Sequence, residues 1–273
     1  MCELFAMSSR ERSSVTYSLN EFSKHGGLTH SNKSGWGIAY FQDRDAFIVK
    51  EPEPAHDSPW VKFIAEQELQ SRFIIAHVRL ATVGQPTLHN THPFRRALGG
   101  RTHVFAHNGT LNGIHEAHRH SELRYEPVGD TDSELAFCLL LERLRETWHD
   151  AREISDVARR LDVFAGFASD MRGRGSSNFL YSDGDALFAH ADRRIYEEGE
   201  GYSDPRPPGL SMRDCVACQL GPEFACDGLK VGMADQRTTL FASVPLDEIG
   251  WEPLPEGVAV AVRDGEEIGR QAT

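Results

Sequence analysis

The sequence predicts an α+β protein in which antiparallel sheets pack on each other and helices cover the outside. Segments typical of strands come early and late in the chain, and the two longest helical patterns lie between them. The regular β-α-β alternation of a doubly wound parallel sheet is missing. The chain has 273 residues, of which 40% are hydrophobic, so it can bury a sizeable core. Because no change in composition divides it, we expect one domain over residues 2–273.

The first half of the chain is expected to hold short strands and two helices. Residues 2–7 form an apolar run typical of a buried strand. Val15, Leu19 and Phe22 are spaced for one face of a helix that Gly26 and Gly27 would end. Further strands are expected at 36–41, 46–49, 73–80 and 103–107, with a hairpin turn at 43–45 and a second helix at 61–69.

The second half begins with the strongest helical pattern, which Asp132 opens and which carries leucines on one side. Another helix is expected at about 154–168. Residues 197–211 are polar and rich in Gly and Pro, which predicts an exposed loop. The remaining strands are expected at 178–181, 186–190, 230–234, 239–244 and 258–262.

Charge and cysteine content bound the function. The net charge of −12 argues against nucleic acid or an anionic membrane as a partner through bulk charge. No run of about 18 apolar residues predicts a membrane-spanning helix, and residues 2–9 do not fit a signal peptide. The cysteines are few and odd in number, which predicts free thiols in a reducing cytoplasm. They are Cys2, Cys138, Cys215, Cys218 and Cys226.

The dipeptide Met1-Cys2 is the most informative feature for chemistry. Cys is small enough for the initiator methionine to be removed, which would leave a thiol and a free α-amine on one residue. A free α-amine titrates at about 7.7–8.0, where a general base is most useful. Cys2 could then supply both nucleophile and base. If Met1 is retained, the amine is blocked and this site is inactive.

Three further positions place polar groups where expected strands end or a helix begins. Arg79 could bind a carboxylate through two parallel hydrogen bonds, or form a structural ion pair. Asn108-Gly109 is a common turn signal, but it could also present an amide and a backbone N–H as an oxyanion hole. Asp132, with Thr131 before it, suits a helix N-cap, or its carboxylate could meet a substrate ammonium.

Together these groups form a set suited to an α-amino acid with an acyl side chain, and five motifs occur in a recognisable order. That order resembles the class II glutamine amidotransferase domain, an N-terminal-nucleophile (Ntn) hydrolase, over residues 2–190. CELFAMS at 2–8 and GWGI at 35–38 look most like its stand-alone bacterial branch, which lacks a fused synthase. The five motifs are Met-Cys, HVRLAT (77–82), NTHPF (90–94), HNGTLNG (107–113) and GDTDSE (129–134).

The resemblance implies a four-layer α/β/β/α sandwich of two mainly antiparallel sheets with the site between the sheet ends. It implies that Cys2 attacks the side-chain amide of glutamine and that its α-amine moves the proton. Asn108 and Gly109 would hold the oxyanion. Arg79 would bind the α-carboxylate and Asp132 the α-ammonium, with Thr82 as a further pocket residue. No metal or other cofactor is implied.

The chain departs from the pattern at two positions. Leu80 and Val83 stand where many members with fused synthases have Trp and His. The resemblance therefore implies hydrolysis without a fused acceptor. Two possibilities stay open: a separate ammonia-accepting protein, or another γ-glutamyl compound, including a peptide, as the substrate.

Two interpretations from other classes also stay open. The departures would suit a non-catalytic module that binds glutamine or a partner protein. Cys215-x-x-Cys218 with Cys226 would suit a metal-binding protein, but too few further ligands follow for a zinc site. His77, His92 and His107 are expected to orient loops by hydrogen bonding rather than to act as catalysts.

Overall fold

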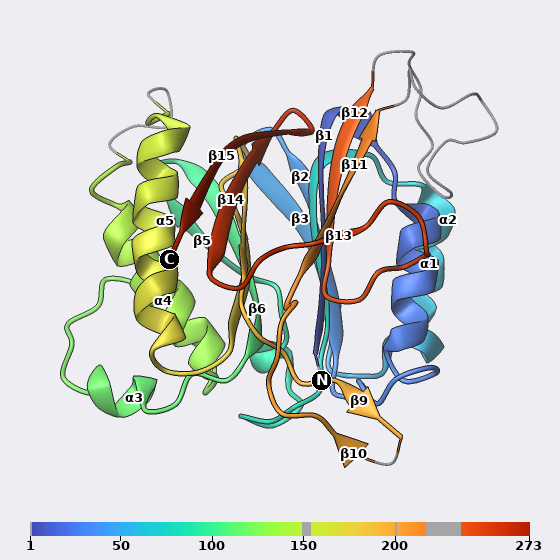
Figure 1. Ribbon diagram of the computed structural model, residues 1–273, viewed down its shortest axis with the longest axis horizontal. Coiled ribbons are helices and arrows are strands. Elements are labelled where there is room, and N and C mark those ends of the chain that lie inside the picture. Colours follow the sequence, from blue (N-terminus) through green and yellow to red (C-terminus); the bar gives the residue numbers. More distant parts are fainter. Residues whose placement is uncertain (1, 149–153, 200, 217–235) are drawn as a thin grey trace.

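Two antiparallel sheets stacked face to face form the centre of the molecule (Figure 1). The computed structural model describes residues 2–148, 154–199, 201–216 and 236–273. The seven-stranded sheet has the order β13-β11-β12-β1-β4-β2-β3, and the six-stranded sheet has the order β15-β14-β8-β7-β6-β5. A two-stranded hairpin, β9 and β10, lies apart from both.

The elements have the following bounds. The strands of the first sheet are β1 (Glu3–Ser13), β2 (Trp36–Gln42), β3 (Asp45–Glu51), β4 (Ser71–Val78), β11 (Ser211–Val216), β12 (Arg237–Ala242) and β13 (Glu252–Pro253). Those of the second are β5 (Phe94–Leu98), β6 (Arg101–Gly109), β7 (Ser177–Ser182), β8 (Leu187–Ala191), β14 (Val258–Arg263) and β15 (Glu266–Ala272). The hairpin strands are β9 (Glu197–Glu198) and β10 (Gly201–Tyr202). The helices are α1 (Thr16–His25), α2 (Pro59–Gln67), α3 (Ile114–Ala117), α4 (Asp132–Leu144) and α5 (Val157–Arg172), with short 3-10 turns at Ala55–Asp57 and Leu88–Asn90.

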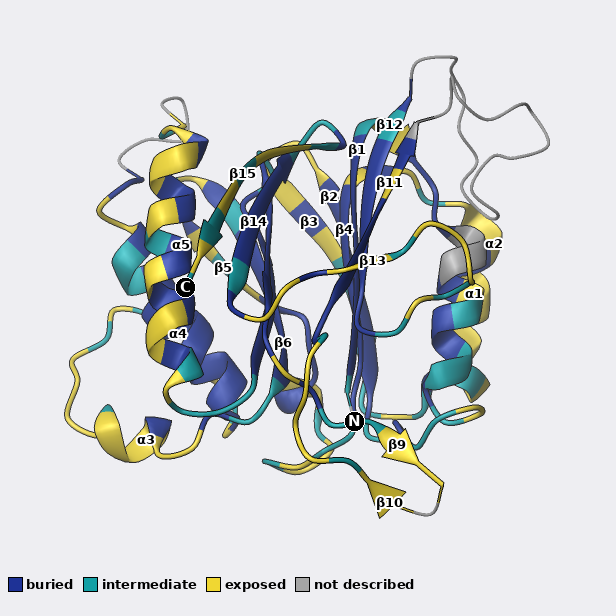
Figure 2. Ribbon diagram, viewed as in Figure 1, coloured by how far each residue is buried: buried dark blue, intermediate teal, exposed yellow. Residues whose placement is uncertain are grey.

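Three hydrophobic cores separate four layers, as Figure 2 shows by the dark strands between half-exposed helices. Strand β1 contributes to two of these cores, because successive side chains of a strand point to opposite faces of the sheet. Leu4 and Ala6 pack into the core between the sheets, whereas Phe5 and Met7 pack under α1 and α2. Helices α4 and α5 cover the outer face of the second sheet in the same way. The predicted α/β/β/α arrangement is confirmed.

Most predicted elements are present, and the differences have physical causes. The helix expected at 154–168 is α5, which begins later and runs to Arg172. β1 continues past Met7 to Ser13, because the buried Ser9 satisfies its hydroxyl with Ser13 of the same strand and with Thr238 of β12. The missed strands β5, β11 and β15 are at or next to a sheet edge and carry charged residues, so they lack an apolar alternation. The strand expected at 230–234 lies outside the described residues.

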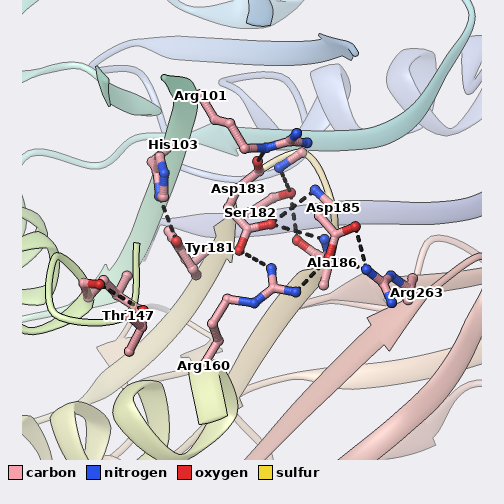
Figure 3. Close-up of polar contacts among 12 residues, drawn as sticks. Arg101, His103, Thr147, Arg160, Tyr181, Ser182, Asp183, Asp185, Ala186 and Arg263 are labelled. Atoms are coloured by element: carbon pink, nitrogen blue, oxygen red, sulfur yellow. Dashed lines mark hydrogen bonds and ion pairs between the residues drawn. The ribbon is translucent and has the colours of Figure 1, made fainter. Parts of the chain in front are cut away.

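A buried ion-pair network joins α5 to the turn between β7 and β8 (Figure 3). The Arg160 guanidinium donates to Asp183 and to Asp185, at 2.5 Å each, and the Arg160 and Asp183 side chains are fully buried. Arg263 of β14 also contacts Asp185. Since separated buried charges are strongly unfavourable, this network holds α5 against the sheet.

Candidate active site

The sulfur of Cys2 lies at the end of the first sheet, between the start of β1 and the residues that follow β4. The Leu80 N–H donates to Sγ over 3.1 Å, and Sγ lies 3.2 Å from the Leu80 carbonyl oxygen. Burial raises the pKa of the Cys2 thiol, while the Leu80 N–H and the Arg79 charge act in the opposite direction. The thiol is therefore neutral at rest and needs a base to become nucleophilic. Met1 lies outside the described residues.

Arg79 follows β4 directly, and its side chain is buried. Its guanidinium donates to the carbonyl oxygens of Val83 (2.8 Å), Gly84 (3.2 Å) and Gln85 (3.0 Å). In the part of the chain that the structure describes, no carboxylate forms an ion pair with it, so the structural ion-pair interpretation is wrong. Burial lowers the pKa of Arg79, and the charges of Cys2 and Asp132 partly compensate. The site thus holds a buried cation that a substrate carboxylate could satisfy.

Asn108 and Gly109 end strand β6 and pair with Asn178 and Ser177 of β7, so they do not form the turn that their sequence alone allows. The Asn108 side-chain amide donates to the main-chain oxygen of Cys2 and, over 3.4 Å, to the Ser243 hydroxyl. Gly109 has a φ of 154°, and a Cβ there would overlap the Ser176 carbonyl. The second sheet thereby presents an amide to the nucleophile of the first.

Asp132 is the first residue of α4, but it does not cap the helix. Thr131 is the N-cap, and its hydroxyl accepts from the Glu134 N–H over 3.2 Å. The Asp132 carboxylate instead accepts from the Leu111 N–H at 2.7 Å and the Ser133 N–H at 2.9 Å. Asp132 is buried, and its negative charge raises the pKa of the nearby Arg79.

The structure brings five of the six predicted site residues to one end of the two sheets. Thr82 is the exception, because its side chain is exposed in the loop after β4 and makes no hydrogen bond to another described residue. A cavity of about 1210 Å³ lies elsewhere, along the edge strands β3 and β5, and is lined by Lys50, Phe94 and Glu134 among others. None of the six predicted residues lines it.

The three histidines near the motifs differ in how far they match the expectation. His107 does orient its surroundings, because its ring nitrogens contact the Ser133 hydroxyl (2.9 Å) and the Ser176 carbonyl (3.1 Å). His77 and His92 stack ring on ring at 4.2 Å. Neither ring nitrogen of His92 has a hydrogen-bond partner among the described residues, so the prediction is wrong for this residue. Burial lowers the pKa of His77 to about 3.

Two residues of the site gave no signal in the sequence. The Ser243 hydroxyl accepts from the Leu4 N–H over 3.1 Å as well as from Asn108. Arg194 is buried and donates to the Ser243 carbonyl at 2.5 Å. Burial lowers the pKa of Arg194, while the nearby charges of Glu3 and Cys2 raise it. No motif marks either residue in the sequence, and only the fold brings Ser243 to Asn108 and Arg194 to Ser243.

The structure describes two cysteines besides Cys2, and neither of them contacts the site residues named above. Cys215 is disulfide-bonded, so the prediction of free thiols is wrong for this residue. Cys2 and Cys138 are free. Cys218 and Cys226 lie outside the described residues. No helix in the described part of the chain is both long and apolar enough to cross a membrane.

Comparison with known proteins places this geometry in a family. The family model for "Glutamine amidotransferases class-II" matches residues 1–273. The chain belongs to the class II glutamine amidotransferases. The resemblance drawn from the five motifs is confirmed.

Individual relatives agree with this assignment. The chain is 35% identical over 196 residues to a protein of Escherichia coli (strain K12) named "Putative glutamine amidotransferase YafJ", covering 72% of this chain and 75% of that one. It is 33% identical over 271 residues to a Haemophilus influenzae protein of the same family name, covering 98% and 86%.

Solved structures share the fold. The structure of a "predicted glutamine amidotransferase" from Pseudomonas aeruginosa has a TM-score of 0.69 at 29% identity and covers 98% of this chain and all of that one. The glutamine phosphoribosylpyrophosphate amidotransferase of Bacillus subtilis has a TM-score of 0.64 at 14% identity, with 99% of this chain and 49% of that one covered. The latter likeness shows the fold alone.

Proposed function

We propose that this chain hydrolyses the side-chain amide of glutamine, or of a γ-glutamyl compound, through a thioester on Cys2. The observation that carries the proposal is the meeting of three groups at one sheet end. These are a thiol, a buried guanidinium without a carboxylate partner among the described residues, and an amide directed at the thiol's own main chain. Each suits a different part of a glutamine molecule.

The reaction begins with binding of the amino-acid end of the substrate. Arg79 takes the α-carboxylate in two hydrogen bonds and exchanges some of its carbonyl contacts for them. Asp132 takes the α-ammonium and is already held in place by two backbone N–H groups. Thr82 is proposed as a further residue of the substrate pocket. These contacts place the side-chain carbonyl against the sulfur.

The chemical steps then use one residue twice. With Met1 removed, the α-amine of Cys2 accepts the thiol proton, and the sulfur attacks the carbonyl carbon. A C–S bond forms, and the oxyanion is held by the Asn108 amide and the Gly109 N–H. The C–N bond breaks as the amine returns the proton to the leaving ammonia. Water, deprotonated by the same amine, then cleaves the thioester to give glutamate and the free thiol.

The fate of the ammonia is part of the proposal. Leu80 and Val83 contact Arg79 and Cys2 through main-chain groups, and they stand where many members with fused synthases have Trp and His. We therefore expect simple release of ammonia, or transfer to a separate protein that accepts it. A γ-glutamyl peptide would release an amine or a peptide in place of ammonia by the same steps.

The experiment compares wild-type protein with Cys2→Ala in release of glutamate from glutamine and from γ-glutamyl peptides. Intact-mass analysis of the same preparation must show loss of one methionine, because the base exists only then. A γ-glutamyl electrophile should label the wild type at Cys2 and leave the variant unlabelled. Equal hydrolysis rates for the two proteins would rule the proposal out. A Cys2 thiol that the electrophile never labels would favour the non-catalytic binding module.

A further inference from the structure

Three side chains able to bind a metal converge beside the nucleophile, and nothing in the proposed hydrolysis uses them. Glu3 is the first residue of β1 and follows Cys2 directly, His25 is the last residue of α1, and His30 lies in the loop before β2. One potential ligand atom from each lies within 4.8 Å of the others. They come from three segments of the chain, so the fold, not a local sequence motif, assembles them.

The distances are close to those of an occupied site. His25 Nδ1 lies 2.6 Å from one carboxylate oxygen of Glu3, and His30 Nδ1 lies 3.9 Å from the other. Zinc binds imidazole nitrogen and carboxylate oxygen at about 2.0–2.2 Å, so two ligands in a tetrahedral site lie roughly 3.3 Å apart. The two observed distances lie on either side of that separation. Each of the two contacts to Glu3 is therefore within about 1 Å of the separation that a tetrahedral site needs.

The surroundings of the carboxylate resemble the outer shell of a metal site. The Glu3 side chain is 1% exposed, and the Asn32 side-chain amide donates to it over 3.2 Å. Such an outer contact fixes the orientation of a ligating carboxylate. Asn32 itself is fully buried, and its other polar atom, Oδ1, has no hydrogen-bond partner among the described residues. An unsatisfied buried oxygen beside the carboxylate could accept a hydrogen bond from a metal-bound water.

The two histidines pack against each other and are partly open to solvent. Their ring planes meet at an angle of 63° with centroids 4.4 Å apart. The side chains of His25 and His30 are 14% and 30% exposed, which leaves a way in for a hydrated ion and an open coordination position.

We propose that Glu3, His25 and His30 bind one Zn²⁺ ion, with Asn32 orienting the carboxylate. A set of two imidazoles and one carboxylate binds Zn²⁺ in preference to Mg²⁺ or Ca²⁺, which prefer oxygen ligands alone. The ion replaces the contact between His25 and Glu3 and the contact between Thr29 Oγ1 and His30 Nδ1. It ties the start of β1 to the end of α1, and so steadies the residue after the nucleophile. The site does not depend on the proposed amide hydrolysis.

The test measures metal binding by untagged full-length protein. Zn²⁺ is titrated in competition with a chromophoric chelator, and Co²⁺ is titrated by its visible absorption. We expect one ion per chain for either metal and no competition by millimolar Mg²⁺ or Ca²⁺. Glu3→Gln and His30→Gln should abolish stoichiometric binding, and Asn32→Ala should weaken it about 10- to 100-fold.

Matched controls separate this site from other ligands. His120→Gln alters an exposed histidine and should leave binding unchanged. Cys2→Ala should do the same, so loss of binding there would overturn the proposal by showing that the thiol is a ligand. Unchanged binding in both Glu3→Gln and His30→Gln, or no stoichiometric binding by the wild type, would also overturn it. His30→Gln changes a partly exposed side chain, and its melting temperature in EDTA should match that of the wild type. Added Zn²⁺ should raise the melting temperature of the wild type alone.

Discussion

Replacing Asn108 with alanine should remove one donor from the oxyanion and leave the fold intact. Loss of one such donor costs roughly 3–4 kcal/mol of transition-state stabilisation, so kcat should fall by about 100- to 1000-fold. Asn108→Ala also removes the two hydrogen bonds that the side-chain amide donates, to Cys2 and to Ser243. At about 1 kcal/mol net for each bond, the free energy of unfolding should fall by about 2 kcal/mol. Glutamate release and thermal unfolding measure the two effects separately.

Ser243→Ala is the matched control for this prediction. This substitution removes the hydroxyl that accepts hydrogen bonds from the Asn108 amide and from the Leu4 N–H, but it removes no oxyanion donor. Its stability should fall by a similar amount while kcat stays within about tenfold of wild type. If Asn108→Ala also stayed within tenfold, or if the two variants lost activity equally, the oxyanion role of Asn108 would be refuted.

Three further predictions concern Gly109 of the proposed oxyanion hole, the buried His103 and the buried ion pair of Arg160. Gly109→Ala should lower kcat at least 100-fold, because its Cβ would overlap the Ser176 carbonyl, whereas Gly166→Ala in α5, with open space around it, should leave kcat unchanged. Burial lowers the pKa of His103 to about 4 in the folded protein. As the pH falls from about 6.5 to about 4, His103 is protonated in the unfolded chain but not in the folded one, so the melting temperature should fall over this range. His103→Asn should reduce that fall in melting temperatures measured at a series of pH values. Arg160→Met leaves the buried Asp183 carboxylate without its cation, while Asp185 keeps Arg263, and should cost about 3–5 kcal/mol in a denaturant titration, with glutaminase activity at 25 °C unaffected as long as the variant is folded.

The inner strands could be predicted because their residues alternate between two cores. Phe5 and Ile74 face helices while Leu4 and Ile75 face the other sheet, so these strands read as unbroken apolar runs. Strand β15 could not be predicted in this way. With charged residues along an exposed face, it depends on its pairing with β14 for its conformation. For such a strand the pairing partner, and not the local pattern, determines the structure.

The site also contains residues that the sequence could predict and residues that it could not. Cys2, Arg79 and Asn108 could be proposed because each polar residue interrupts or ends an apolar run. Ser243 and Arg194 could not, because they act through main-chain and hydroxyl contacts that exist only after distant segments meet. Asn-Gly at 108–109 is a further case. Its sequence favours a turn, but pairing with β7 extends it as a strand and directs its amide to Cys2.

The identity of the base follows from what surrounds the thiol. Burial raises the pKa of Cys2, so proton removal must be assisted. His77 is a poor candidate, because burial lowers its pKa to about 3 and a ring so weakly basic does not take a thiol proton at neutral pH. Both ring nitrogens of His107 are already engaged, by Ser133 and Ser176. The α-amine of Cys2, titrating near 8 once Met1 is removed, matches the task best. A preparation that retains Met1 should therefore be inactive even with every other contact in place, and adding a methionine aminopeptidase should restore glutamate release in step with the mass loss.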